Sequence, residues 1–124
     1  MLTVLVVDDE PDVRLIARLV LTAAGFEVRE VGSGDAALAE LRTASAPDVV
    51  LLDLRMPGLH GWEVLRHLRA DDALQALPGV VFTADLDSQA DAPNELRAGD
   101  VLLTKPFQAD DLLRAVQDAV AHRA

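Results

Sequence analysis

Five side chains able to bind a cation or a phosphoryl group each follow an apolar run of the sequence. They comprise three carboxylates, one hydroxyl and one ammonium group: Asp8, Asp9, Asp53, Thr83 and Lys105. In a doubly wound sheet, ligands bind beyond the carboxyl ends of the strands, so these side chains are expected to converge there. Oxygen ligands that leave room for water are typical of Mg²⁺, with Mn²⁺ as an alternative, rather than of zinc or iron.

The alternative interpretation is that these residues are merely polar. Loops are exposed, and any one of the five would more often be a solvated loop residue than a ligand. The argument for a site depends on their coincidence at the ends of four separate runs. We therefore interpret the group as a metal and phosphoryl site.

The runs that precede these side chains are short and continuously apolar, which is typical of strands buried on both faces. Two weaker candidates complete a set of five strands: 3–7, 27–31, 49–52, 79–82 and 101–104. Apolar residues at three- and four-residue spacing predict helices, and they recur within 13–24, 37–41, 62–68 and 112–120. Pro11 suits the first turn of the first helix, and Gly25 suits its end. The alternation predicts an α/β fold with a parallel sheet and helices on both faces.

One further helix is expected between the fourth and fifth strands, but its sequence is poor. The segment DSQADAPNELRAG (87–99) contains one large apolar residue, Leu96, and has Pro93 in its middle. Proline in a helix interior costs about 3 kcal/mol, so we expect this helix to be kinked, shortened or partly irregular.

The composition describes one soluble globular domain. The chain of 124 residues is long enough for a single core, and its formal net charge is −10. Such a charge disfavours direct binding to nucleic acid or to an anionic membrane, because both need basic surfaces. The absence of cysteine excludes disulfides and thiolate metal sites. The first residues show no signal or membrane-spanning segment, and we predict a cytoplasmic protein.

Four short motifs resemble those of a known family when they are taken together in this order. They are VDDE (7–10), LLDLRMPGLHG (51–61), TA (83–84) and KPF (105–107). The set resembles the receiver domain of bacterial two-component response regulators and is similar to the single-domain chemotaxis response regulator. The resemblance implies a flavodoxin-like (βα)5 fold with strand order 2-1-3-4-5. We expect residues 1–124 to form a single receiver domain, with no output domain in this chain.

The resemblance implies that Asp53 accepts a phosphoryl group from the phosphohistidine of a sensor histidine kinase or a phosphotransfer protein. Phosphorylation would then change the surface that the protein presents to an unknown downstream target. The protein would not be an enzyme beyond its own phosphorylation and slow autodephosphorylation. An ionised carboxylate is a competent nucleophile at neutral pH, but attack on an anionic phosphoryl group requires nearby positive charge.

The resemblance also implies the roles of the surrounding residues. The metal would be held by three carboxylates and one backbone carbonyl: Asp8, Asp9, Asp53 and the carbonyl of Arg55. Lys105 would contribute a positive charge and Thr83 a hydroxyl donor to the phosphoryl group. A cis peptide between Lys105 and Pro106 would orient the lysine.

Two features depart from the family pattern, and two positions near the proposed site vary within the family. Leu102 stands three residues before Lys105, where receiver domains usually carry Tyr or Phe, so the standard aromatic switch is in doubt. The connection before this strand is also one residue shorter than usual. Arg55 and Asp85 lie two residues after Asp53 and Thr83, and we predict that they pair as a gate that hinders hydrolysis of the acyl phosphate.

Three alternatives differ in class from a stand-alone switch. The chain could be a phosphorylation-independent pseudo-receiver that only binds other proteins, or the receiver part of a longer DNA-binding regulator. A small α/β phosphatase would need a further acid or a phosphate loop, and neither is evident. For the leading interpretation we expect protein partners and no direct contact with nucleic acid or membrane. A homodimer is possible.

Overall fold

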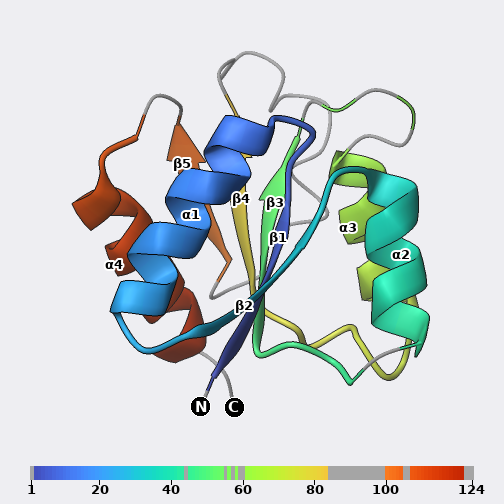
Figure 1. Ribbon diagram of the computed structural model, residues 1–124. Coiled ribbons are helices and arrows are strands. Elements are labelled where there is room, and N and C mark those ends of the chain that lie inside the picture. Colours follow the sequence, from blue (N-terminus) through green and yellow to red (C-terminus); the bar gives the residue numbers. More distant parts are fainter. Residues whose placement is uncertain are drawn as a thin grey trace.

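The computed structural model describes residues 2–43, 45–54, 56, 58, 61–83, 100–104 and 107–121. Its centre is a five-stranded parallel sheet with the order β2-β1-β3-β4-β5, which confirms the predicted topology (Figure 1). The strands are β1 (Thr3–Val7), β2 (Glu27–Val31), β3 (Val49–Asp53), β4 (Gly79–Thr83) and β5 (Val101–Thr104). All predicted strands are confirmed, and β3 and β4 each extend one residue further than expected.

Four helices cover the two faces of the sheet. They are α1 (Pro11–Ala23), α2 (Gly34–Thr43), α3 (Gly61–Ala70) and α4 (Ala109–Ala121). Figure 1 shows α1 and α4 on one face and α2 and α3 on the other. The weak helix expected within 87–99 lies outside the described residues. Within the described ranges, no helix combines the length and the apolar character that crossing a membrane requires.

The first helix begins and ends as its sequence predicts. Pro11 is its first residue, and Gly25 follows its end with a φ of 96°. The N–H of Phe26 donates to the carbonyl of Leu21 at 3.0 Å and closes the last turn. Glycine adopts this left-handed conformation without the strain of a side chain, so the helix can end sharply before β2.

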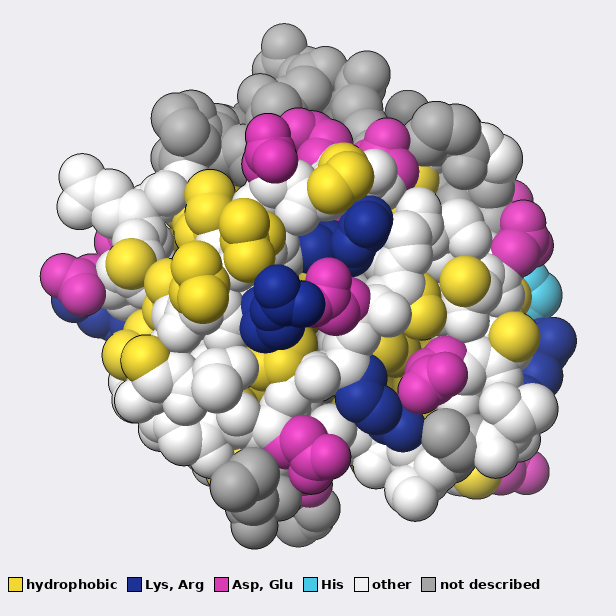
Figure 2. All heavy atoms as spheres, in the orientation of Figure 1, with side chains coloured by type: hydrophobic (Ala, Val, Ile, Leu, Met, Phe, Trp, Pro, Cys, Tyr) yellow, Lys and Arg dark blue, Asp and Glu magenta, His cyan; other side chains and the backbone are white. Residues whose placement is uncertain are grey.

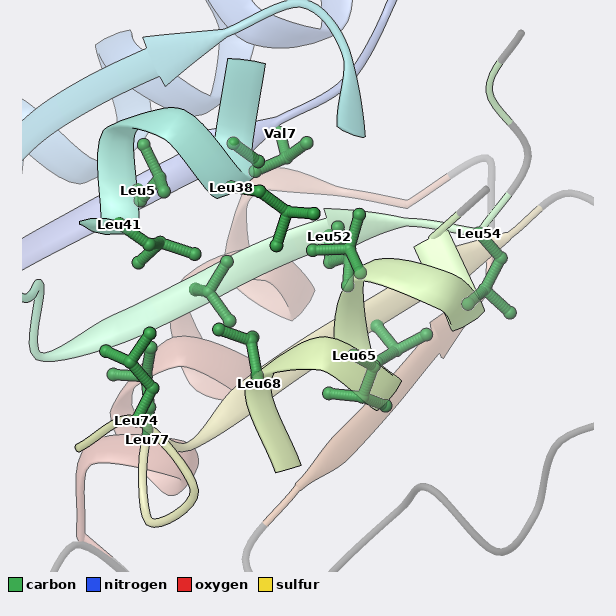
Figure 3. Close-up of a cluster of buried hydrophobic side chains, with 14 of the residues drawn as sticks. Leu5, Val7, Leu38, Leu41, Leu52, Leu54, Leu65, Leu68, Leu74 and Leu77 are labelled. Carbon is green, nitrogen blue, oxygen red and sulfur yellow. The ribbon is translucent and has the colours of Figure 1, made fainter. Parts of the chain in front are cut away.

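Alternate residues of each inner strand face two separate cores, which explains why these runs are continuously apolar. One core packs under α2 and α3 and includes Leu5, Val7, Leu38, Leu41, Leu52, Leu65 and Leu68 (Figure 3). The other packs under α1 and α4 and includes Val4, Val6, Ala17, Leu21, Leu51, Phe82, Leu112 and Val116. Burial on both faces fixes the strands and therefore the position of their carboxyl ends.

The edge strand β2 carries charged side chains that pair with helices on both faces. Arg29 Nη1 lies 3.3 Å from Glu40 Oε1 of α2. On the other face, Glu30 Oε2 accepts a hydrogen bond from Arg18 Nη1 of α1 at 2.9 Å. Figure 2 shows basic and acidic side chains side by side on the face that carries α1 and β2. The edge of the sheet is thus flanked by ion pairs on both sides.

A buried ion pair joins elements at the amino end of β4 and β5. Arg69 Nη2, at the end of α3, lies 2.6 Å from Asp100 Oδ2, and the two side chains are 7% and 2% exposed. Arg69 Nη1 also donates to the carbonyl of Leu77 at 2.7 Å. Asp100 Oδ1 accepts the N–H of Gly79 at 2.9 Å. These bonds tie the end of α3 to the starts of both strands.

Candidate metal and phosphoryl site

The turn after β1 is built around a buried carboxylate. Asp8 is fully buried, and its Oδ1 accepts the N–H of Glu10 at 2.9 Å. Its own N–H donates to the carbonyl of Val31 at 3.3 Å. Aspartate commonly stabilises a turn by bonding to the backbone two residues further on. The bond fixes the turn that leads into α1 and leaves Asp9 and Glu10 exposed at the sheet edge.

The second part of the site is the end of β3. Asp53 is 3% exposed and lies opposite Phe82 of β4 in the parallel register. The next residue, Leu54, donates its N–H to the carbonyl of Phe82 at 3.0 Å. Its carbonyl accepts the N–H of Gly61 at 3.1 Å. Backbone bonds from β4 and from the start of α3 therefore hold the segment that carries Asp53.

Gly61 allows α3 to begin directly against this segment. A Cβ atom at Gly61 would collide with the carbonyl oxygen of Asp53 and would lie 2.7 Å from the Cα of Leu54. Real Cβ contacts are not this short, so any other residue would move the backbone. This glycine is the last residue of the motif LLDLRMPGLHG, and no role was predicted for it from the sequence. A glycine at the start of a helix that follows a functional loop is the available signal.

Four carboxylates converge where the ends of β1 and β3 meet. Oxygen atoms from Asp8, Asp9, Glu10 and Asp53 all lie within 4.8 Å of one another. Two unit charges at about 5 Å repel by about 1 kcal/mol even at the dielectric constant of water, and by more in a partly buried site. This all-oxygen donor set, half buried and half exposed, suits Mg²⁺, which binds few carboxylates and keeps several waters.

The structure thus brings together the predicted residues Asp8, Asp9 and Asp53. Glu10 belongs to the same group and had not been predicted as a ligand, although it adjoins the acid pair. Figure 2 shows acidic side chains gathered at the top of the molecule, above the carboxyl ends of the strands.

The remaining predicted site residues are described only in part. The backbone of Thr83 ends β4 opposite Thr104, but its side chain is not among the described ones. Arg55, Asp85, Lys105 and Pro106 lie outside the described residues. Their predicted roles as metal ligand, gate, phosphoryl contact and cis peptide therefore stay predictions.

Leu102 occupies the position at which an aromatic switch residue was expected from the family pattern. It lies opposite Val81 in the register of β4 and β5, and it is 37% exposed. Two residues after Lys105 in the sequence, Phe107 packs edge-on against Phe82, with ring centroids 5.8 Å apart. Trp62, the only tryptophan, is half-buried at the start of α3 and packs against the core under α2 and α3.

Comparison with known proteins identifies a consistent group of relatives. The sequence profile of the response regulator receiver domain matches residues 4–117. The chain is 39% identical over 115 residues to the DNA-binding response regulator MtrA of Mycolicibacterium smegmatis. That alignment covers 92% of this chain and 48% of MtrA, so the chain spans about half the length of the curated relatives it matches.

Solved structures agree with this likeness along the whole chain. A putative response regulator from Chloroflexus aurantiacus superposes with a TM-score of 0.88 at 30% identity, covering 97% of this chain and 98% of that one. The response regulator TrrA from Thermotoga maritima, solved in complex with Mg²⁺ and BeF, gives a TM-score of 0.83 at 30% identity. That match covers 96% of this chain and 99% of TrrA.

Proposed function

Because the chain belongs to the family of response regulator receiver domains of two-component systems, we propose that Asp53 is its phosphoryl acceptor. Receiver domains are generally signalling domains rather than catalysts, and the proposed chemistry is confined to the protein's own aspartate. The donor is the phosphohistidine of a sensor histidine kinase or phosphotransfer protein. Phosphorylation then alters the surface that a downstream protein recognises.

The observation that carries this proposal is the position of Asp53. Its carboxylate is almost fully buried at the carboxyl end of the sheet, and it lies within 4.8 Å of the carboxylates of Asp8, Asp9 and Glu10. Carboxylates this close repel one another, and binding of a divalent cation would relieve that repulsion. The group is well suited to hold a divalent cation beside a nucleophile.

The proposed reaction forms a bond from a carboxylate oxygen of Asp53 to phosphorus and breaks the phosphorus–nitrogen bond of the donor. The imidazole leaves and takes a proton from solvent. Mg²⁺, when bound by Asp8, Asp9, Asp53 and the carbonyl of Arg55, supplies the positive charge that lets two anions approach. Lys105 adds a positive charge and the hydroxyl of Thr83 a hydrogen bond to the phosphoryl oxygens.

An apolar surface on α1, the helix that follows the acidic turn, supports a protein as the phosphoryl donor. Leu15, Ile16 and Leu19 of α1 are 43%, 50% and 60% exposed. Figure 2 shows hydrophobic side chains grouped on this face of the molecule. Because α1 begins directly after the acidic turn, a protein that covers this surface would lie next to Asp53.

The test is incubation with acetyl phosphate and Mg²⁺, followed by intact-mass measurement. We expect the wild type to gain one labile phosphoryl group and Asp53→Asn to gain none. Asp12→Asn is the matched control, because Asp12 is an exposed acid of α1 outside the acidic group, and it should behave as the wild type. A wild type that gains no mass would favour the pseudo-receiver alternative.

The gate between Arg55 and Asp85 is a further proposal about the same site. An exposed pair contributes at most about 1 kcal/mol, but a small change in water access is enough to alter the lifetime of an acyl phosphate. We expect Arg55→Ala to change the rate of dephosphorylation. An unchanged lifetime would exclude the gate.

A DNA-binding regulator is the second candidate function. It is favoured by the similarity to MtrA, of which this chain spans about half. In that case residues 1–124 act as the receiver domain of a longer protein, and phosphorylation controls the attached output. Reading the gene beyond the codon for Ala124 distinguishes this candidate from a stand-alone domain.

A further inference from the structure

One cationic side chain reaches the backbone of the acidic turn. Arg14, in the second turn of α1, donates from Nη1 to the carbonyl of Asp8 at 2.7 Å. Its Nε lies 3.5 Å from Glu30 Oε1 of β2, and Glu30 also pairs with Arg18. A Cβ at Gly32 would lie 3.1 Å from Arg14 Nη1, so the glycine leaves room for the guanidinium. Arg14 thus sits between the carboxyl ends of β1 and β2.

The bond from Arg14 acts on the peptide that joins the two predicted metal ligands. The carbonyl of Asp8 and the N–H of Asp9 belong to one rigid plane. Fixing the carbonyl therefore fixes the direction in which the chain leaves Asp8 and presents Asp9. The bond from the Glu10 N–H to Asp8 Oδ1 fixes the carboxylate side of the same turn. The carboxylates are oriented by both restraints together.

We propose that Arg14 is a positioning residue that orients the acidic turn for binding a divalent cation. This inference rests on the proposed function, because it assumes that the four acids hold a metal. Groups that orient metal ligands typically change metal affinity by about 10–100-fold when they are removed. Glu30 acts one step further away, by holding the guanidinium from β2.

The proposal predicts a change opposite in sign to that expected from charge alone. Removing a positive charge near a cation site lowers repulsion and should strengthen binding of Mg²⁺. Removing a positioning bond should weaken it, because the ligands then have to be ordered when the metal binds. The direction of the change in Arg14→Ala therefore separates the two effects.

The experiment measures the Kd for Mg²⁺ by calorimetry, with the fluorescence of Trp62 as a second readout. We expect Arg14→Ala to bind roughly 10-fold more weakly than the wild type. Arg18→Ala is the matched control, because Arg18 also pairs with Glu30 but makes no hydrogen bond to the described residues of the acidic turn. It should bind as tightly as the wild type or slightly more tightly. Arg14→Lys, which keeps the charge and one donor, should recover most of the affinity.

A second variant tests the proposal without changing any charge. Gly32→Ala places a methyl group against the guanidinium of Arg14 and should weaken Mg²⁺ binding several-fold. It also keeps the test decisive if Arg14→Ala fails to fold, which circular dichroism would show. Unchanged or tighter binding in the folded variants overturns the role of Arg14. Failure of the wild type itself to bind Mg²⁺ would instead overturn the proposed function.

Discussion

Buried charges are arranged in opposite ways at the two ends of the parallel sheet. At the amino end of β4 and β5, one acid meets one base, since Asp100 and Arg69 lie 2.6 Å apart and are both buried. At the carboxyl end, Asp8 and Asp53 are both buried. Their carboxylate oxygens lie within 4.8 Å of one another and of those of two exposed acids, Asp9 and Glu10. Opposite charges attract and tie elements together, whereas carboxylates this close repel one another.

The largest loss of stability is expected from removing the buried ion pair at the amino end of the sheet. Arg69→Ala should lower the free energy of unfolding by about 3 kcal/mol, because Asp100 then loses its guanidinium partner while it stays buried. Urea denaturation measures the change. Arg18→Ala removes an arginine whose side chain is 51% exposed, and it should cost less than about 1 kcal/mol. Equal losses in the two variants would contradict a special role for the buried pair.

An intermediate loss of stability is expected from a substitution at Gly61, where α3 begins against the carboxyl end of β3. Gly61→Ala should lower the free energy of unfolding by about 1–3 kcal/mol, because the added methyl group forces the backbone of Asp53 and Leu54 to move. It should also slow phosphorylation by acetyl phosphate. Gly79→Ala is the control, since a Cβ there would find its nearest atoms at 3.7 Å. A Gly61→Ala protein with wild-type stability and rate would show that this close approach is unimportant.

The smallest change in stability is expected from Asp9→Asn, and it tests whether the acidic group binds Mg²⁺. In EDTA, Asp9→Asn should melt roughly 3 °C above the wild type, because one like charge has been removed from the group. With saturating Mg²⁺ the wild type should gain more stability than the variant, because it binds the ion more tightly. The order of the two melting temperatures should then reverse. An identical shift in both proteins would argue against a role for Asp9 in metal binding.

Much of the fold follows from local sequence. Continuous apolar runs predicted β1, β3 and β4, and weaker patterns predicted β2 and β5. Pro11 and Gly25 predicted the bounds of α1, because helix starts and stops depend on the backbone conformation of neighbouring residues. The convergence of Asp8, Asp9 and Asp53 followed from the parallel topology. These predictions needed no knowledge of which side chains touch.

Three features that sequence reasoning missed depend on contacts that appear only once the chain has folded. Arg69 and Asp100 are 31 residues apart, and neither stands out from other charged residues in the sequence. Arg14 resembles any surface arginine of an amphipathic helix until its distance to the carbonyl of Asp8 is known. Gly61 is required by how closely the start of α3 approaches the end of β3, and its place at the start of a helix is only a weak signal of that approach.

The charges on β2 also bear on how the protein behaves at high concentration. An edge strand presents unpaired backbone groups that can recruit a strand from another molecule and begin aggregation. Glu27, Arg29 and Glu30 account for three of the five residues of β2, and the last two are already paired with helices. A second copy pairing in antiparallel or parallel register would have to accommodate these charges and disturb their ion pairs. Glu30, which holds Arg14 beside the acidic turn, therefore also helps to protect the protein against sheet extension at this edge.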